Sequence, residues 1–403
     1  MNTYRVLAFA TLLTSSTFSA VEAQETRAEA QRQQREEKQR AAKPYAPTTV
    51  ERALKAVETG GIPLITRDGL YAKLGSLTTG SGFAYGAGYR TRRFISHDGG
   101  LDAWGGASIK GYWAAEARAR FQHLASGHVL VEGLVRRHEY PQEDFFGLGP
   151  DSRRADQTDF ALRTTTIGAR VAVRPTGIVA VGGGLEYLTP RVGNGTDKAV
   201  PSIGAQFDDA SAPGLAAQPD YLHTIAFVDV DWRRPLNARN GGWYRVELSH
   251  YDDRDLGAYT FNRLDIDVRQ FVGFLSERRV LFGRAFVSMS DPGDGQRMPF
   301  YLMPALGGND SLRGFRDYRF RGPHALLLQG EYRFEIWSGL DGALFYDTGK
   351  VAMRRGDLDF NNLESDYGLG FRFNTDNGVV VRVDAAFGST DGKHLWIVFG
   401  GRF

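Results

Sequence analysis

From Gly69 to the end of the chain, apolar and polar residues alternate with a period of two, as in the segments 263–269, 326–336, 367–373 and 379–387. The first of these sets Leu264, Ile266 and Val268 against Arg263, Asp265, Asp267 and Arg269. Such alternation is typical of β-strands whose two faces meet different environments. A charge lying alone in hydrocarbon costs about 2–4 kcal/mol at mid-depth, so the charged faces must point to a wet or internally paired interior. The pattern predicts an all-β transmembrane barrel.

Sixteen segments fit this pattern, which predicts a 16-stranded antiparallel β-barrel. They are 69–77, 83–94, 101–108, 113–123, 128–139, 158–174, 177–189, 222–235, 242–252, 259–273, 279–291, 324–337, 340–352, 364–373, 378–388 and 394–403. Tight turns, such as 125–127, alternate with longer loops, such as 190–221 and 291–324. Short periplasmic turns and longer outer loops are the rule for outer-membrane barrels. If every long connection is placed outside, the strands alternate in direction consistently along the whole chain. A β-sandwich has the same period, but its polar faces would not carry both signs of charge so regularly.

The chain ends on a strand closed by an aromatic residue. The last ten residues place Leu395, Ile397, Phe399 and Phe403 on one face, and Trp396, Val398, Gly400 and Arg402 on the other. Such a segment describes one crossing of a bilayer, apolar toward lipid and mixed toward a lumen. We expect Trp396, Phe399 and Phe403 to form a C-terminal barrel signal, which places the protein in the outer membrane of a Gram-negative-type bacterium.

The start of the chain predicts export. A short basic start, an apolar run over 6–20 and the small residues around Val21-Glu22-Ala23 are typical of a secretory signal peptide, which we assign to residues 1–23. Residues 24–68 are polar, and Thr48 with Glu51 forms a capping box before a Gly60 stop. We expect a periplasmic segment there that contains one short helix. Residues 69–403 form the barrel.

Composition limits the function classes. The 403 residues contain no cysteine, and 49 Lys+Arg against 47 Asp+Glu give a formal net charge of +2. These values disfavour a disulfide framework, a thiolate metal site and a polyanion-binding surface. Ser96, His97 and Asp98 are consecutive and cannot themselves form a triad, and the histidines show no metal-ligand spacing. We expect no enzyme activity, no cofactor, no metal and no nucleic-acid partner.

The most specific signal lies in the long connection 291–324. It consists of Met298-Pro299-Phe300-Tyr301, then Gly307-Gly308, then Leu312-Arg313-Gly314-Phe315, and it is followed by Phe345, Asp347 and Gly349 in LFYDTGKV. With this set, in this order, the chain resembles the BamA/TamA outer-membrane assembly family, the bacterial surface antigen barrels. The resemblance covers residues 69–403. It implies sixteen strands and a loop after the eleventh that folds back inside the barrel.

The motif residues suggest how that loop is held. An arginine on a loop inside a barrel can pair with an inward carboxylate through a bidentate, charge-assisted contact. The resemblance implies that Asp347 is the partner of Arg313. Gly314 would let the backbone turn beside the wall, and Phe315 would wedge the loop tip. Two roles stay open, namely a structural pin that holds the loop and a functional switch.

Two functions remain. The first is assembly or translocation of outer-membrane protein or lipid through a lateral seam, and the second is a passive structural or porin-like barrel. Family members that insert membrane proteins carry periplasmic POTRA domains, and the 45 residues of 24–68 are too few for one. We therefore expect outer-membrane lipid, including lipopolysaccharide, as a partner, together with an unidentified periplasmic or outer-membrane protein.

The terminal strand gives a first testable prediction. The protein should fractionate with outer membranes and migrate faster on a denaturing gel when unboiled, because closed barrels resist unfolding by detergent. Deleting Phe403 should lower its abundance in that fraction, whereas Phe403→Tyr should preserve it. Recovery as a soluble periplasmic protein would contradict the assignment.

Overall fold

The computed structural model describes residues 68–95, 99–233, 239–375 and 378–399. The expected signal peptide, nearly all of the 24–68 segment, Ser96-His97-Asp98 and Phe403 lie outside these residues. Phe399 lies in the last described strand, and its side chain is not described. No helix among the described residues is long and apolar enough to cross a bilayer.

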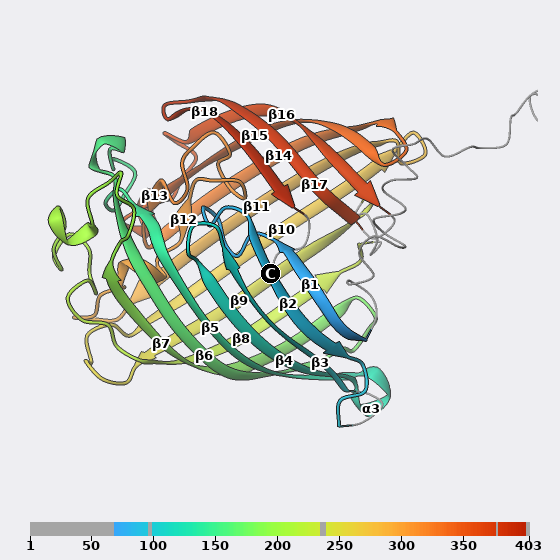
Figure 1. Ribbon diagram of the computed structural model, residues 1–403, viewed down its shortest axis with the longest axis horizontal. Coiled ribbons are helices and arrows are strands. Elements are labelled where there is room, and N and C mark those ends of the chain that lie inside the picture. Colours follow the sequence, from blue (N-terminus) through green and yellow to red (C-terminus); the bar gives the residue numbers. More distant parts are fainter. Residues whose placement is uncertain (1–67, 96–98, 234–238, 376–377, 400–403) are drawn as a thin grey trace, which may run out of the picture. The chain divides into compact units, whose positions relative to one another are not determined.

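Sixteen long strands form one antiparallel sheet in which each strand pairs with its neighbours along the chain (Figure 1). They are β1 (Gly69–Gly75), β2 (Ala84–Thr91), β3 (Gly99–Ser108), β4 (Trp113–His123), β5 (Val129–Phe145), β6 (Thr158–Val173), β7 (Val179–Asn194), β8 (Tyr221–Asp231), β9 (Gly241–Asp253), β10 (Phe261–Phe274), β11 (Arg279–Pro292), β14 (His324–Trp337), β15 (Leu340–Ala352), β16 (Glu364–Thr375), β17 (Gly378–Ser389) and β18 (Gly392–Phe399). The prediction of sixteen antiparallel strands is confirmed.

Shorter elements lie in the connections. They are α3 (Leu124–Gly127), the 3-10 helices η2 (Arg154–Asp156), η3 (Ile203–Ala205), η4 (Phe300–Leu302) and η5 (Arg355–Asp357), and the two-residue strands β12 (Ala305–Leu306) and β13 (Phe320–Arg321). β12 pairs with β13 to form the base of a hairpin within the long connection between β11 and β14.

The strand ends differ from the prediction mainly where prolines occur. β5 runs to Phe145 and β7 to Asn194, beyond the expected ends at 139 and 189. Pro141 falls in the register shift between Tyr140 and Glu143, where the ladder is already interrupted. Pro190 lies beyond the last pair of β7 with β8, so β7 has only one partner there. Both prolines mark places with fewer ladder bonds, and neither ends its strand.

The two faces of the sheet differ as the alternation predicts. Leu344 and Tyr346 of β15 are each 52% exposed on the outer face, while Phe345 and Asp347, which alternate with them along the strand, are buried inside. The connections after β1, β3, β5, β7, β9, β11, β15 and β17 lie at the end that carries the long loops, which is the extracellular end. Clusters of buried aromatic and aliphatic side chains fill the lumen near that end.

β1 and β18 are the two ends of the sheet order. They lie side by side, and no hydrogen-bonded register joins them within the described part of the chain (Figure 1). Every other pair of neighbouring strands is joined by a hydrogen-bonded register. The wall of the barrel therefore has one seam, between its first and last strands.

Candidate functional site

The long connection between β11 and β14 folds inward, and its residues 305–321 are called the plug loop here. The β12–β13 hairpin closes its base, and the Gly308 N–H donates to the Phe315 carbonyl oxygen at 3.1 Å. Gly307 has φ +119°, and a Cβ there would lie 2.2 Å from the Arg316 carbonyl oxygen. Glycine is the residue that allows this turn.

Apolar side chains fix the plug loop to the inner wall. Leu312 and Phe315 are fully buried, in a cluster with residues of the loop and of the wall: Leu306, Phe320, Ala325, Leu327 and Val351. The Phe315 and Phe320 rings meet edge to face at 5.2 Å between centroids. Fully burying one such side chain contributes roughly 1.5–3 kcal/mol. Burial of Leu312 and Phe315 therefore makes a large contribution to holding the loop against the wall.

Arg313 is the polar centre of the loop. Its Nε donates to Asp347 Oδ2 at 2.6 Å and its Nη2 donates to Asp347 Oδ1 at 2.8 Å, which is a bidentate contact. Its Nη1 donates to Glu331 Oε2 at 2.9 Å, and its guanidinium lies 3.5 Å from the centroid of the Phe345 ring. Arg313 is 3% exposed. The guanidinium is thus enclosed by two carboxylates and one aromatic face.

The neighbouring carboxylates are shared among several arginines. Glu331 accepts hydrogen bonds from Arg313, Arg333 and Arg372, and Arg372 also donates to Asp384. Asp366 stands directly opposite Asp347 in the β15–β16 register, and its buried carboxylate oxygens have no hydrogen-bond partner among the described residues. Two acidic groups therefore face each other where Arg313 enters. A buried charge without its partner is costly, so this wall requires a cation from the loop.

Electrostatics favour a permanently charged Arg313. Burial disfavours the guanidinium cation, but the hydrogen bonds and charge of Asp347, with the charges of Glu331 and Asp384, raise the pKa of Arg313 above its ordinary value. The guanidinium of Arg313 therefore stays charged at every physiological pH. Arg313 also lines a lumenal cavity of about 490 Å³ whose walls carry six more arginines: Arg233, Arg269, Arg284, Arg333, Arg372 and Arg382.

Two glycines allow the loop to approach the wall. A Cβ at Gly314 would lie 2.5 Å from Asp366 Cβ and 3.1 Å from Ser389 Cβ. A Cβ at Gly349 would lie 2.5 Å from the Leu326 carbonyl oxygen and 3.2 Å from Leu306 Cδ1, at the base of the plug loop. Each glycine removes a side chain where loop and barrel meet.

The plug loop also contacts the strands at the seam. On one side, Trp396 Nε1 of β18 donates to the Arg313 carbonyl oxygen at 2.6 Å, and Arg319 pairs with Asp391 of the β17–β18 turn at 3.3 Å. On the other side, the Tyr318 hydroxyl hydrogen-bonds to Thr78 Oγ1, at 2.9 Å, in the β1–β2 connection. One loop thus bridges the two edges of the sheet.

Asp317 lies on the β1 side of this bridge. A Cβ at Gly80 would lie 3.0 Å from its Oδ2, and its buried Oδ1 accepts no hydrogen bond among the described residues. Burial raises the pKa of Asp317 to about 7, the charge of Asp144 adds to the rise, and Lys110 opposes it. This carboxyl group therefore titrates close to physiological pH.

The structure brings most of the proposed site residues together. Gly307, Gly308, Leu312, Arg313, Gly314 and Phe315 form the plug loop, and Phe345, Asp347 and Gly349 lie on the inner wall against it. Trp396, proposed only as part of a terminal signal, also contacts the loop. Glu331, Arg372 and Asp384 lie on the charged, inward-predicted faces of the alternating segments 326–336, 367–373 and 379–387, but the alternation did not show that they converge on Arg313. The described residues contain no group of three or more side chains suited to a metal ion.

Comparisons with known proteins agree with this geometry. Residues 235–392 match the Omp85 superfamily domain. The barrel is similar to BamA from Haemophilus ducreyi lacking POTRA domains 1–3, with 11% identity, a TM-score of 0.60, and coverage of 83% of this chain and 70% of that one. It is also similar to CdiB from Escherichia coli, with 14% identity, a TM-score of 0.54, and coverage of 83% and 62%. No curated protein sequence matches the chain. The chain therefore has the fold of an outer-membrane β-barrel, and its residues 235–392 are similar to the Omp85 superfamily domain.

The ion pair gives a second prediction. Arg313→Ala should leave a folded barrel with a more exposed plug loop, because removing one partner of a buried ion pair costs about 3–5 kcal/mol. Asp347→Asn should have a similar effect, and the double variant should be no worse than the more damaged single one if the two act as a pair. Limited proteolysis of the loop measures this. Arg316→Ala is the matched control, and additive losses would show that the pair is not coupled.

Asp317 gives a third prediction. Its raised pKa means that docking the loop favours the protonated form, so this contribution is present below about pH 4 and is lost as pH rises through about 7. Protection factors for amide exchange over residues 307–322, which correct for the intrinsic pH dependence of exchange, should therefore be higher at pH 5 than at pH 8. Asp317→Asn should remove this difference and raise the protection factors at pH 8. An unchanged pH dependence in the variant would assign the effect to another group.

Proposed function

We propose that this barrel assists the assembly or translocation of outer-membrane protein or lipid by opening its wall between β1 and β18. The observation that carries the proposal is the absence of a hydrogen-bonded register between these two strands within the described residues. Unpaired strand edges can accept another strand or separate to expose the lumen to lipid. A seam of this kind supplies a route between lumen and bilayer.

The lengths of the seam strands support the proposal. β1 has seven residues, and β2 and the described part of β18 have eight each, against 10 to 17 in the other strands of the 16-stranded sheet. A full crossing takes about 9–11 residues, and both β1 and the described part of β18 are shorter than that. Separation at this position costs fewer hydrogen bonds than separation elsewhere in the sheet.

The plug loop adds control in this proposal. Its Arg313 end is tied to β18 and its Tyr318 end is tied to the β1–β2 connection. Docked, the loop holds the two edges near each other. Released, it would free both edges and clear the lumen, so the Arg313–Asp347 contact would act as a switch as well as a pin.

A passive, porin-like barrel is the second candidate. The polar lumenal cavity favours it, because charged side chains that line a pore interact with permeating ions. Each of its seven arginines, counting Arg313, is paired with a carboxylate. The plug loop limits the width of such a path. In this case the seam would stay closed, and conductance would depend on the arginines and not on separation of β1 from β18.

A disulfide across the seam separates the two functions and gives a fourth prediction. The chain has no cysteine, so pairs introduced between Gly69–Gly75 and Gly392–Phe399 can be scanned without background. Oxidation of a pair that forms should abolish acceleration of the folding of a second barrel protein into liposomes, and reduction should restore it. Conductance of the same preparation in planar bilayers is measured in parallel.

The control pair is Ala103 with Ala117, which stand opposite each other in the paired β3–β4 ladder. Locking this pair should leave folding activity unchanged, since these strands have no need to separate. If the seam-locked and free barrels work equally, the seam has no role. If neither accelerates folding and both conduct anions alike, the passive function is correct.

A further inference from the structure

A row of polar side chains crosses the outer face of the barrel near its extracellular end. The register places Thr224, His250, Asn262 and Asp291 directly beside one another on β8, β9, β10 and β11. One row further into the membrane the same strands carry apolar residues, Ala226, Leu248, Leu264 and Met289. Neighbouring strands lie about 4.8 Å apart, so the polar row spans about 14 Å. The change from apolar to polar marks the depth where acyl chains end and head groups begin.

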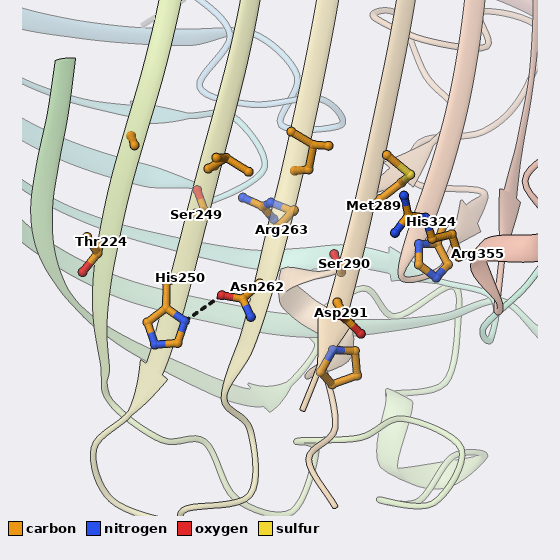
Figure 2. A pocket seen from close by; sticks show the side chains of 14 residues that line it. Thr224, Ser249, His250, Asn262, Arg263, Met289, Ser290, Asp291, His324 and Arg355 are labelled. Atoms are coloured by element: carbon orange, nitrogen blue, oxygen red, sulfur yellow. Dashed lines mark hydrogen bonds between the residues drawn. The ribbon is translucent and has the colours of Figure 1, made fainter. Parts of the chain in front are cut away.

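This part of the outer face is hollowed. A groove of about 710 Å³ runs over both rows, and His324 of β14 and Arg355 of η5 line one end of it (Figure 2). Met289 is paired with His324 in the β11–β14 register, so the apolar row leads directly to this end. A groove of this size can hold a head group and the first part of an acyl chain, which a flat barrel surface cannot.

The polar atoms of the groove have free hydrogen-bonding capacity. His250 Nδ1 and Asn262 Oδ1 are 2.8 Å apart, which leaves His250 Nε2 and the Asn262 amide nitrogen available (Figure 2). His324 is 7% exposed, and its Nδ1 is buried without a hydrogen-bond partner among the described residues. A buried polar atom of this kind calls for a partner.

Arg355 supplies the charge at this end of the groove. The adjacent Arg354 pairs with Asp357 at 2.9 Å, whereas no ion pair of Arg355 occurs in the described ranges. Arg355 is exposed and lies within electrostatic reach of His324, as does Asp291. An anionic group placed here would meet a guanidinium and an imidazole, with the Asn262 amide beside them.

We infer that this groove binds a lipid of the outer leaflet whose head group carries a phosphate. The phosphate meets Arg355 and His324, and an acyl chain lies over Leu248, Leu264 and Met289. Asp291 offers an acceptor to a hydroxyl or ammonium group of the same head. A polypeptide strand does not fit, because β8, β9, β10, β11 and β14 are each paired on both sides and offer no free edge. The site depends on the membrane location of the barrel and not on opening of the seam.

Native mass spectrometry of the full-length protein tests this inference, with phosphatidylglycerol and a neutral galactolipid of the same acyl chains as probes. The wild type should retain phosphatidylglycerol in preference to the galactolipid. Arg355→Gln with His324→Gln should reduce that retention at least about tenfold, because charge-assisted hydrogen bonds contribute about 1.5–3 kcal/mol each. Arg354→Gln, on the same loop but outside the groove, should retain the lipid as the wild type does.

A second variant tests the apolar floor and protects the experiment against misfolding. Leu264→Trp should fill the groove and lower retention of phosphatidylglycerol, whereas Val246→Trp, on the outer face of β9 but outside the groove, should not. The unboiled gel shift identifies folded variants. If the double variant fails to fold, lipid retention by the single variant Arg355→Gln, at an exposed position, tests the inference instead. Equal retention of both lipids would overturn the inference, and so would equal retention by the wild type and Arg355→Gln. A cross-linker placed at position 262 that captures a polypeptide in place of a lipid would also overturn it.

Discussion

The need to neutralise buried acidic groups determines how the lumen is organised. Asp347 and Asp366 face each other across β15 and β16, and Asp384 and Glu331 lie close by. Arg333 and Arg372 of the strands pair with Glu331 and Asp384, whereas Asp347 receives its bidentate contact from Arg313 of the loop. The rest of the loop follows from this contact, because the glycines, the apolar cluster and the hairpin base all serve to deliver one guanidinium to one wall. Without that cation, Asp347 would lose its bidentate partner at a buried position of the inner wall, which is costly.

The seam is the complementary constraint. The interior junctions are held by long backbone ladders, whereas the junction of β1 with β18 relies on side-chain contacts that reach it through the plug loop. The same loop therefore neutralises the wall and bridges the weakest junction. The lipid groove lies on β8 to β14, in the middle of the strand order and far along the sheet from that junction. A lipid bound there would stabilise the part of the wall, β8 to β14, that stays closed when β1 and β18 separate.

The sequence allowed all sixteen strands to be predicted, although some ends are wrong by up to six residues, because the period of two records which environment each face meets. It could not reveal the network around Arg313, since the period says nothing of how strands are staggered against each other. Glu331 and Arg372 were both recognised as inward-facing, yet their contact depends on the register of three strands and on the path of the loop. The groove was missed for a related reason. His250, Asn262 and Asp291 each look like an ordinary polar residue near a strand end, and only the register shows that they form one row.

The plug-loop contacts make the extracellular end of the seam different from its periplasmic end. Thr78 lies in the extracellular connection after β1, and Asp391 lies in the extracellular turn before β18, so both edges are fastened at the same end. Toward the periplasm, nothing comparable joins the described parts of the two strands. Strand edges that are held together at one end separate most at the other end. A gap between β1 and β18 would therefore be narrow at the outer surface and wide toward the periplasm. A substrate arriving from the cell interior would reach the wide, periplasmic end of this gap first. The contacts at the extracellular end would keep the outer surface closed while β1 and β18 separate.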